Sequence, residues 1–348
     1  MQPNHFSRRQ FVQGLAAGGA LASVAPGVLA QAKGPQRPSD AKLIAAAKAD
    51  GSLSVYTGSS TASLQADSAA FEKAYGIKIS FTQMTSGPLG ARVDQEIKAG
   101  RINADIIISA DSTTMYRWVA GGYLGKLPDG AFPDRTEALA PIQTIYQSLF
   151  YNTQGVPKDQ IPKSWNDLLN PRFAGKIVIG SPRIGPAYAT QYLALMKEPG
   201  LGEAWFQKLA AQKPRIVATP ALVAQLCAAG EALVAFNGIP YDAANIVTAN
   251  PGAPIAYTYL DPVTTARTYV GINAKAAKMN AARLFAAWLM SVEGQTVHNG
   301  ENRASSLLGN LPGTLAAPDL KRVRTEYTAN KVTMEYQNII SLFDRTFK

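Results

Sequence analysis

The sequence predicts an α/β protein made of two parts, each with a mainly parallel sheet. Short apolar segments alternate with amphipathic segments along the chain, which is the pattern of strands joined by right-handed helical crossovers. This alternation occurs in two successive series, and 348 residues are enough for two domains. Hydrophobic residues make up 47% of the chain and charged residues only 17%, so each part can bury a core.

The first series contains three expected strands and two expected helices. The strand candidates at 53–57, 77–81 and 105–109 are short, apolar and bounded by turn residues. Between them, the segments 62–74 and 89–99 repeat apolar residues at helical spacing. Strands in this order are expected to lie parallel in one sheet.

The second series starts near residue 146 and repeats the alternation without repeating the sequence. Strands are expected in YQSLFYN, in KIVIG after a loop, in ALVAFN and in PIAYTYLD. Helices are expected in AYATQYLALMK, GEAWFQKLAAQ and PALVAQLCAAG. From Tyr269 onward the pattern predicts one more strand, a long helix that reaches 297, and terminal helices after 318.

The N-terminus carries the pattern of an export signal. Arg8 and Arg9 precede the weakly apolar stretch GLAAGGALASVAPGVLA, which is too short and too rich in Gly and Ala to span a bilayer. Small residues at Ala30 and Ala32 suit cleavage. Segment 1–32 therefore resembles a twin-arginine signal peptide, and the mature protein is expected in the periplasm.

Charge and cysteine content narrow the class of partner. Without the two signal arginines, 32 basic residues face 24 acidic ones, a net charge of +8. These residues are scattered and form no basic stripe with interleaved aromatics, so nucleic acid is not expected as a partner and a small anionic ligand is favoured. The one cysteine, Cys227, is expected in the core, without a disulfide.

Polar loops follow the expected strands where an open parallel sheet binds ligands, beyond the carboxyl ends of its strands. The loops TGSSTAS, MTSGPLG, SADSTT and GSPRIGPAYA are small and rich in Gly, Ser and Thr. Free backbone N–H groups at helix starts attract oxyanions, although the same Ser and Thr residues are also common helix N-caps. The ligand-binding candidates in these loops are Thr57, Ser59, Ser60, Ser86, Gly87, Asp111, Ser112, Ser181, Arg183, Gly185 and Ala187.

Several of these segments together resemble the extracellular solute-binding proteins of ABC importers, in the ferric-iron or family 1 branch. The most specific phrase is PKSWNDLLNPRFAGKI, with RINADIIISADSTTMYRWVAGGYLGKL and VGINAKAAKMNAARLFAAWLMSVEGQ beside it. The resemblance implies a two-lobed periplasmic-binding-protein fold of type II, whose lobes are joined by two crossover strands and close on a ligand. The implied lobes are 33–144 plus 262–316, and 145–261 plus 317–348. It also implies a monomer without a cofactor, with an inner-membrane permease as its partner.

The resemblance also bears on the ligand. Ferric members of the branch hold iron with two adjacent tyrosines, where this chain reads Asn237-Gly238-Ile239-Pro240-Tyr241. Only Tyr241 and Asp111 would remain as anionic oxygen ligands for Fe(III), which makes a ferric role the alternative rather than the first expectation. Other members take up anionic organic solutes, so a phosphonate, sugar phosphate or carboxylate is expected, with Asn237 and Tyr241 among the ligand contacts.

One of the four loops departs from the family pattern, and two further anion candidates lie outside these loops. Gly185-Pro186-Ala187 aligns with the stretch whose N–H groups hold an anion in ferric relatives, but Pro186 has no N–H. Arg183 is expected to compensate with a bidentate contact. Arg267 and Arg303 are additional candidates, and each has a plain surface role as its alternative.

An enzyme on the same fold is the competing class, and the chain lacks the chemistry for it. The mature segment has one histidine, His298, expected near a helix end, and no nucleophile motif or cluster of metal-binding residues. Docking on a sensory receptor instead of a permease stays open, because the fold does not decide between these roles.

Overall fold

The computed structural model describes residues 33–184, 186–318, 323–324 and 329–347, so the expected signal segment 1–32 and Gly185 lie outside the described residues. The chain divides into two compact units. Of the described residues, unit 1 contains those up to Thr144 and Arg267–Ala316, whereas unit 2 contains Ile145–Ala266 and those from Ala317 onward. No helix among the described residues is both long enough and apolar enough to cross a membrane.

Unit 1 is built on a sheet whose central strands are parallel. Strand β1 (Leu53–Thr57) lies between β2 (Ile79–Gln83) and β3 (Ile106–Ser109), and it pairs with both in parallel. The second half of β11 (Val263–Asn273) pairs antiparallel with β3, and the short β4 (Leu124–Gly125) pairs with β11. The helices of unit 1 are α3 (Ala41–Asp50), α4 (Thr61–Tyr75), α5 (Ser86–Lys98), α6 (Ser112–Ala120), α11 (Met279–Leu289) and α12 (Val292–Asn299).

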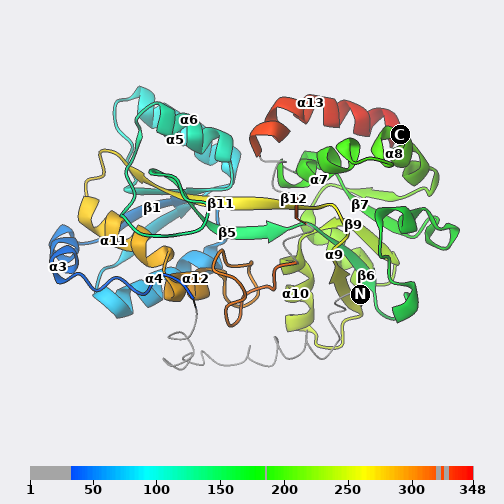
Figure 1. Cartoon of the computed structure of the whole chain (residues 1–348), viewed down its shortest axis with the longest axis horizontal. Coiled ribbons are helices and arrows are strands. Elements are labelled where there is room, and N and C mark those ends of the chain that lie inside the picture. The colour runs from blue at the N-terminus through cyan, green and yellow to red at the C-terminus, as the bar shows by residue number, and fades with distance from the viewer. Residues whose placement is uncertain (1–32, 185, 319–322, 325–328, 348) are drawn as a thin grey trace. The chain divides into compact units, whose positions relative to one another are not determined.

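Helices cover both faces of this sheet, which is why β3 begins with three consecutive buried isoleucines. In β3, Ile106 and Ile108 pack in the core with Phe71 of α4, while Ile107 packs on the opposite face with Trp118 of α6. Figure 1 shows α5 and α6 over one face and α4, α11 and α12 over the other. The predicted α/β class is confirmed for this unit.

Unit 2 has a five-stranded mixed sheet in the order β10-β6-β9-β7-β8. Strand β7 (Ile177–Gly180) pairs in parallel with β8 (Arg215–Val217) and β9 (Val234–Gly238), and β6 (Ser148–Asn152) pairs antiparallel with β9 and β10 (Ile255–Thr258). Its helices are α7 (Pro186–Lys197), α8 (Gly202–Ala211), α9 (Pro220–Ala228), α10 (Pro240–Ala249) and α13 (Ala329–Thr346). Short 3-10 turns cover Lys158–Gln160, Trp165–Leu169, Pro171–Phe173 and Pro182–Ile184.

An aromatic cluster forms the core of unit 2. Tyr192 of α7 packs against Phe206 of α8, Phe236 of β9 and Phe343 of α13. In Figure 1, α7, α8 and α13 lie on one side of this sheet and α9 and α10 on the other. Cys227 of α9 is fully buried, as expected, and burial raises the pKa of its thiol to about 12.

The chain passes between the units within two paired strands and once more at Ala316–Ala317. The first passage lies in β5 (Ala140–Tyr146), after Thr144, and the second lies in β11, after Ala266. Strand β11 continues from Val263 to Asn273 without a break across this second passage. The first part of β11 pairs with β12 (Val323–Arg324).

The expected long helix up to residue 297 is wrong, because the structure divides it into α11 and α12. Ser291 begins the second helix: its hydroxyl accepts from the Gly294 N–H at 3.1 Å and donates to the Trp288 carbonyl at 2.6 Å. A β-carbon on Gly294 would lie 1.9 Å from that carbonyl oxygen, so the close approach of the two helix ends requires glycine.

Candidate functional site

Three helices of unit 1 begin at neighbouring strand ends. Thr57, the last residue of β1, is in register with Gln83 of β2 and Ile108 of β3, so the carboxyl ends of these strands share one edge of the sheet. Helices α4, α5 and α6 start directly after them. Their N-termini carry partial positive charge and unpaired N–H groups, and an edge of this kind suits an oxyanion.

The loop after β1 is held by its own hydrogen bonds and leaves one hydroxyl unpaired. Thr57 Oγ1 accepts from the Ser59 N–H at 2.9 Å, and the Gly58 N–H donates to the Ile108 carbonyl at 2.7 Å. The Ser59 side chain is buried, and its hydroxyl has no hydrogen-bond partner within the described residues. This buried hydroxyl is therefore free to bind a ligand.

Two of the predicted residues act as helix caps. Ser60 Oγ accepts from the Ser63 N–H at 3.1 Å at the start of α4. Asp111 caps α6: one carboxylate oxygen accepts from the Thr114 N–H at 3.1 Å and the other from the Thr114 hydroxyl at 2.7 Å. Ser112 follows Asp111 and is 5% exposed. The capping alternative accounts for Ser60 and Asp111.

Helix α5 starts differently, because no side chain caps it. Thr85 occupies its N-cap position without a side-chain hydrogen bond to the helix. Ser86 is half-buried, and a β-carbon on Gly58 would lie 3.7 Å from its hydroxyl, so the first and second loops approach each other here. Gly87 is exposed with open space beside it. The α5 N-terminus is therefore the part of this edge best suited to accept an external anion.

In unit 2, the expected anion contact of Arg183 is replaced by an ion pair. The Arg183 guanidinium binds the Asp344 carboxylate of α13 at 2.6 Å, and both side chains are more than half exposed. Ser181 is buried, and its hydroxyl accepts from the Arg183 N–H at 3.2 Å. Gly185 lies outside the described residues, and Ala187 is placed only as part of the first turn of α7.

A set of polar residues with unpaired oxygens lies where β7 and β9 end and α7 and α10 begin. It consists of Tyr188, Asn237 and Asp242, and each has one buried oxygen without a partner in the described chain: Tyr188 Oη, Asn237 Oδ1 and Asp242 Oδ2. The Asn237 amide donates to the Tyr188 carbonyl at 2.9 Å, which ties two of the three together. Sequence reasoning selected Asn237 but missed Tyr188.

Burial raises the pKa of two of these residues, Asp242 and Tyr188. It raises the pKa of Asp242 to about 6. Burial also raises the pKa of Tyr188, and the nearby Asp242 charge adds to that rise. Tyr188 therefore stays neutral, whereas Asp242 changes its charge near pH 6.

The residues expected for the ferric alternative do not form an evident metal site. Both Asp111 oxygens are occupied by Thr114, and Tyr241 is half-buried at the second position of α10. Within the described part of the chain, three or more His, Cys, Asp or Glu residues do not gather in any one place as they would around a metal ion.

The other charged or titratable candidates have internal partners. Arg267 pairs with Asp134 at 2.7 Å, and Arg303 is buried and donates to the Val297 and His298 carbonyls at the end of α12. His298 is fully buried and its Nδ1 lies 2.7 Å from Asp67 Oδ2. These residues hold unit 1 together.

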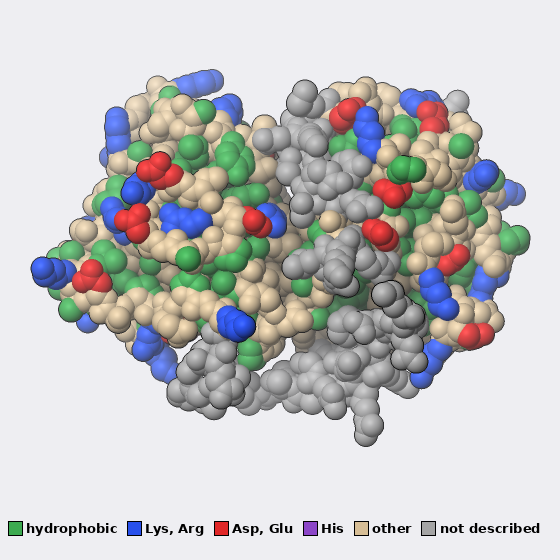
Figure 2. Space-filling model, in the orientation of Figure 1, with side chains coloured by type: hydrophobic (Ala, Val, Ile, Leu, Met, Phe, Trp, Pro, Cys, Tyr) green, Lys and Arg blue, Asp and Glu red, His purple; other side chains and the backbone are tan. Residues whose placement is uncertain are grey.

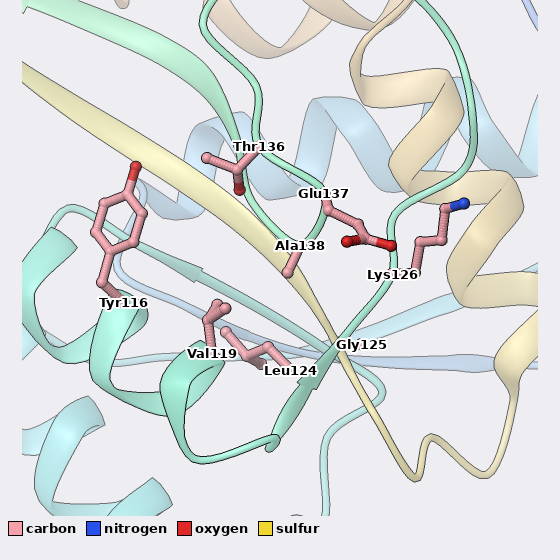
Figure 3. A pocket seen from close by; sticks show the side chains of 8 residues that line it. All are labelled: Tyr116, Val119, Leu124, Gly125, Lys126, Thr136, Glu137 and Ala138. Carbon is pink, nitrogen blue, oxygen red and sulfur yellow. The ribbon is translucent and has the colours of Figure 1, made fainter.

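A cavity of about 320 Å³ lies elsewhere in unit 1, between α6, β4 and the segment 126–138 (Figure 3). None of the expected ligand-binding residues lines it. Lys126 and Glu137 are the charged residues that line this cavity, and Val119 and Leu124 are among the apolar residues that line it (Figure 3). Basic side chains on the face shown in Figure 2 are scattered among acidic ones.

Comparison with known proteins identifies the family. Residues 57–296, more than half of the chain, match the family described as bacterial extracellular solute-binding protein. The fold is similar to that of iron-bound HitA from Pseudomonas aeruginosa, with a TM-score of 0.69 and 19% identity over 85% of this chain and 99% of that one.

Two further structures have a similar fold. The substrate-binding protein of an ABC transporter from Agrobacterium tumefaciens has a TM-score of 0.68 and 14% identity, over 86% of this chain and 94% of that one. AfuA from Actinobacillus pleuropneumoniae, with fructose 6-phosphate bound, has a TM-score of 0.60 and 22% identity, over 85% and 98%. No curated protein matches the sequence. The chain belongs to the family of bacterial extracellular solute-binding proteins.

Proposed function

We propose that this protein is the substrate-binding component of an ABC importer and captures a small anionic organic solute, such as a phosphonate, a sugar phosphate or a carboxylate. The observation that carries the proposal is the edge of unit 1 at which α4, α5 and α6 begin together. The family supports the binding role, and a solute-binding protein holds its ligand without converting it.

The electrostatics of this edge favour an anion over a neutral solute. Each helix N-terminus contributes roughly half a positive elementary charge, and its first N–H groups lack partners within the helix. At α5 no side chain caps these groups, and the Ser59 hydroxyl is unpaired on the loop after β1, whose Gly58 lies near Ser86 at the start of α5. The oxygens of a phosphate, phosphonate or carboxylate can accept hydrogen bonds from these N–H groups and from the Ser59 hydroxyl.

Export and partners follow from the family and from segment 1–32. We propose that this segment directs the chain through the twin-arginine pathway to the periplasm. There, the monomeric protein with its solute would dock on an inner-membrane permease.

The ferric alternative has a specific point in its favour, since two of the structural neighbours contain bound iron. Against it stand the missing adjacent tyrosine pair and the involvement of both Asp111 oxygens in the cap of α6. We therefore keep Fe(III), with Tyr241 and Asp111 as ligands, as one outcome of the test.

The test starts with native mass spectrometry of the protein purified from periplasm, followed by a thermal-shift panel. The panel contains phosphonates, sugar phosphates, carboxylates, and Fe(III) with citrate. An organic anion that raises the melting temperature in proportion to the logarithm of its concentration supports the proposal. Stabilisation by Fe(III) alone, with a red-brown phenolate absorption, would replace it by the ferric alternative.

A variant pair locates the effect in unit 1. Ser59→Ala removes the unpaired hydroxyl, and Ser52→Ala is its control, because Ser52 is exposed in the turn before β1. If the edge binds the anion, stabilisation by the solute decreases in the first variant and is unchanged in the second. Equal responses of both variants would remove this edge from the site.

A further inference from the structure

Arg267 of unit 1 has an internal partner that uses only part of its guanidinium group. Its Nη2 lies 2.7 Å from Asp134 Oδ2, whereas its Nε is buried and has no hydrogen-bond partner within the described chain. Nε and Nη2 form one edge of the guanidinium, and that edge matches two oxygens of a carboxylate or phosphate group. Asp134 therefore leaves one of the two donors of this edge without an acceptor.

Another arginine of this chain shows the same edge in full use. Arg345 donates from Nε to one carboxylate oxygen of Glu203 at 2.9 Å, and from Nη2 to the other oxygen at 2.8 Å. At Arg267 the Nε donor is buried and unpaired, and a buried unpaired donor costs free energy. A group that brings an oxygen to both donors would therefore bind Arg267 better than Asp134 does.

The strand register places Arg267 at the edge of unit 1 where α4, α5 and α6 begin. Tyr269 pairs antiparallel with Ser109, the last residue of β3. The residues of β11 before Tyr269 therefore extend beyond the carboxyl end of β3, and Arg267 lies about 7 Å past it. Side chains two positions apart share a face, so Arg267 lies on the face where Tyr269 packs against Tyr116 of α6.

The ion pair of Arg267 is accessible to solvent, unlike the contacts of the other buried arginine. The side chain of Asp134 is 58% exposed and that of Arg267 is 24% exposed. Arg303, in contrast, is 6% exposed and donates to the Val297 and His298 carbonyls. Exposed ion pairs contribute little to stability, so an incoming anion can replace the Asp134 carboxylate at small cost.

We propose that Arg267 binds the anionic group of the solute through Nε and Nη2, and that Asp134 occupies the guanidinium until the solute replaces it. This inference rests on the proposed function, in which this edge of unit 1 binds the anion. A phosphonate, phosphate or carboxylate group presents two oxygens and accepts from both donors at once. In the free protein, Asp134 competes with the solute for the same arginine.

Competition of this kind gives the two members of one ion pair opposite effects on affinity. Loss of the Arg267 guanidinium removes a contact of the solute and weakens binding. Loss of the Asp134 charge removes the competitor and strengthens binding. An ion pair that only stabilises the fold would not produce this difference in sign, because either variant breaks the same pair.

The experiment measures affinities for ethylphosphonate, glucose 6-phosphate and propionate by isothermal titration calorimetry. The variants are Arg267→Gln, Asp134→Asn and the double variant, and asparagine suits the left-handed φ of 51° at Asp134. Arg117→Gln and Asp129→Asn are the controls, because they make the same charge changes at exposed positions of unit 1. Melting temperatures without solute establish that each variant folds, and Arg267→Lys is made alongside.

We expect Arg267→Gln to weaken binding by about tenfold or more, because two charge-assisted hydrogen bonds are lost. Asp134→Asn should tighten binding by about two- to fivefold, since an exposed ion pair no longer has to be broken. In the Arg267→Gln background, Asp134→Asn should bring no gain. Each control should change affinity by less than about twofold at physiological salt, where exposed charges are screened.

The outcomes separate the inference from the function on which it rests. If a probe binds and Arg267→Gln keeps the wild-type affinity, or Asp134→Asn does not tighten binding, the inference is wrong and the proposed function stands. Wild-type affinity in Arg267→Lys would overturn the contact through two donors, because lysine keeps the charge without the planar edge. If none of the three probes binds to the wild type, the proposed function fails for these anion classes, and the inference fails with it.

Discussion

The Asn237 amide nitrogen donates a hydrogen bond to the backbone carbonyl of Tyr188 at 2.9 Å, which joins the end of β9 to the first turn of α7. Asn237 is fully buried and adopts a left-handed φ of 68°. Asparagine tolerates this conformation better than most other non-glycine residues. Both the left-handed backbone and the side-chain hydrogen bond therefore favour asparagine at this position.

Asn237→Ala should therefore destabilise the protein by about 1–3 kcal/mol, through the lost hydrogen bond and the left-handed backbone. Urea unfolding followed by circular dichroism measures this change. Asn245→Ala on the exposed side of α10 is the control and should change the free energy of unfolding by less than about 0.5 kcal/mol. Equal effects of the two variants would mean that the bond at Asn237 does not stabilise unit 2.

The pKa of Asp242 gives a pH-dependent stability term. Burial raises it from an ordinary value of 3.8 to about 6, so the folded protein binds the proton more tightly than the unfolded chain. The contribution of Asp242 to the free energy of unfolding therefore decreases as pH rises from about 4 to about 6. Above that range the full destabilisation by the buried carboxylate is reached. A shift of this size corresponds to about 3 kcal/mol at most.

A difference measurement isolates this term from the other carboxylates. The stability of Asp242→Asn relative to the wild type should increase by about 1–3 kcal/mol between pH 4.5 and pH 7, as seen by urea unfolding. The same comparison with Asp159→Asn should show no such increase. A constant difference for Asp242→Asn across this range would contradict the assigned burial effect.

Ser59 and Ser60 are neighbours with separable roles. Ser59→Ala removes an unpaired buried hydroxyl, so stability should change little while solute affinity falls by about 1–3 kcal/mol. Ser60→Ala removes the cap of α4 and should cost about 0.5–2 kcal/mol of stability with affinity nearly unchanged. Denaturant unfolding and calorimetric titration of both variants provide the check, and the reverse pattern would exchange their roles.

Arg183→Ala should affect neither function nor fold strongly. Its guanidinium forms an exposed ion pair with Asp344, and such pairs contribute about 0–1 kcal/mol. Arg215→Ala, which breaks the similarly exposed pair with Glu231, is the matched control. Thermal unfolding and solute titration should give the same small changes for both. A large loss of affinity in Arg183→Ala alone would restore this arginine as an anion contact.

Much of the secondary structure could be predicted because its signals are local. The expected strand at 53–57 coincides with β1, and the expected helix at 62–74 lies within α4. At the start of the expected strand 105–109, the Asp105 carboxylate accepts from the Ser54 and Lys278 N–H groups. Such features depend on the spacing of apolar residues and on turn residues, which lie within a few positions of one another in the sequence.

Other features depended on contacts between distant segments. Arg183 lies in a candidate loop, but its partner Asp344 comes from the far end of the chain. Tyr188 gave no signal of its own, because a tyrosine in the first turn of a helix is usually a packing residue. It became a candidate only when the structure showed that its phenol oxygen is buried without a partner in the described chain.

The sequence by itself determined the α/β class, the order of strands and helices, and the family to which the chain belongs, because these depend on local periodicity and on short motifs. The tertiary structure alone decided which polar side chains are paired internally and which are not. Ser60, Asp111 and Arg183 found partners, while Ser59, Tyr188 and Asp242 each kept an unpaired oxygen. Whether a buried group is satisfied depends on atoms distant in the chain, and sequence spacing does not contain that information.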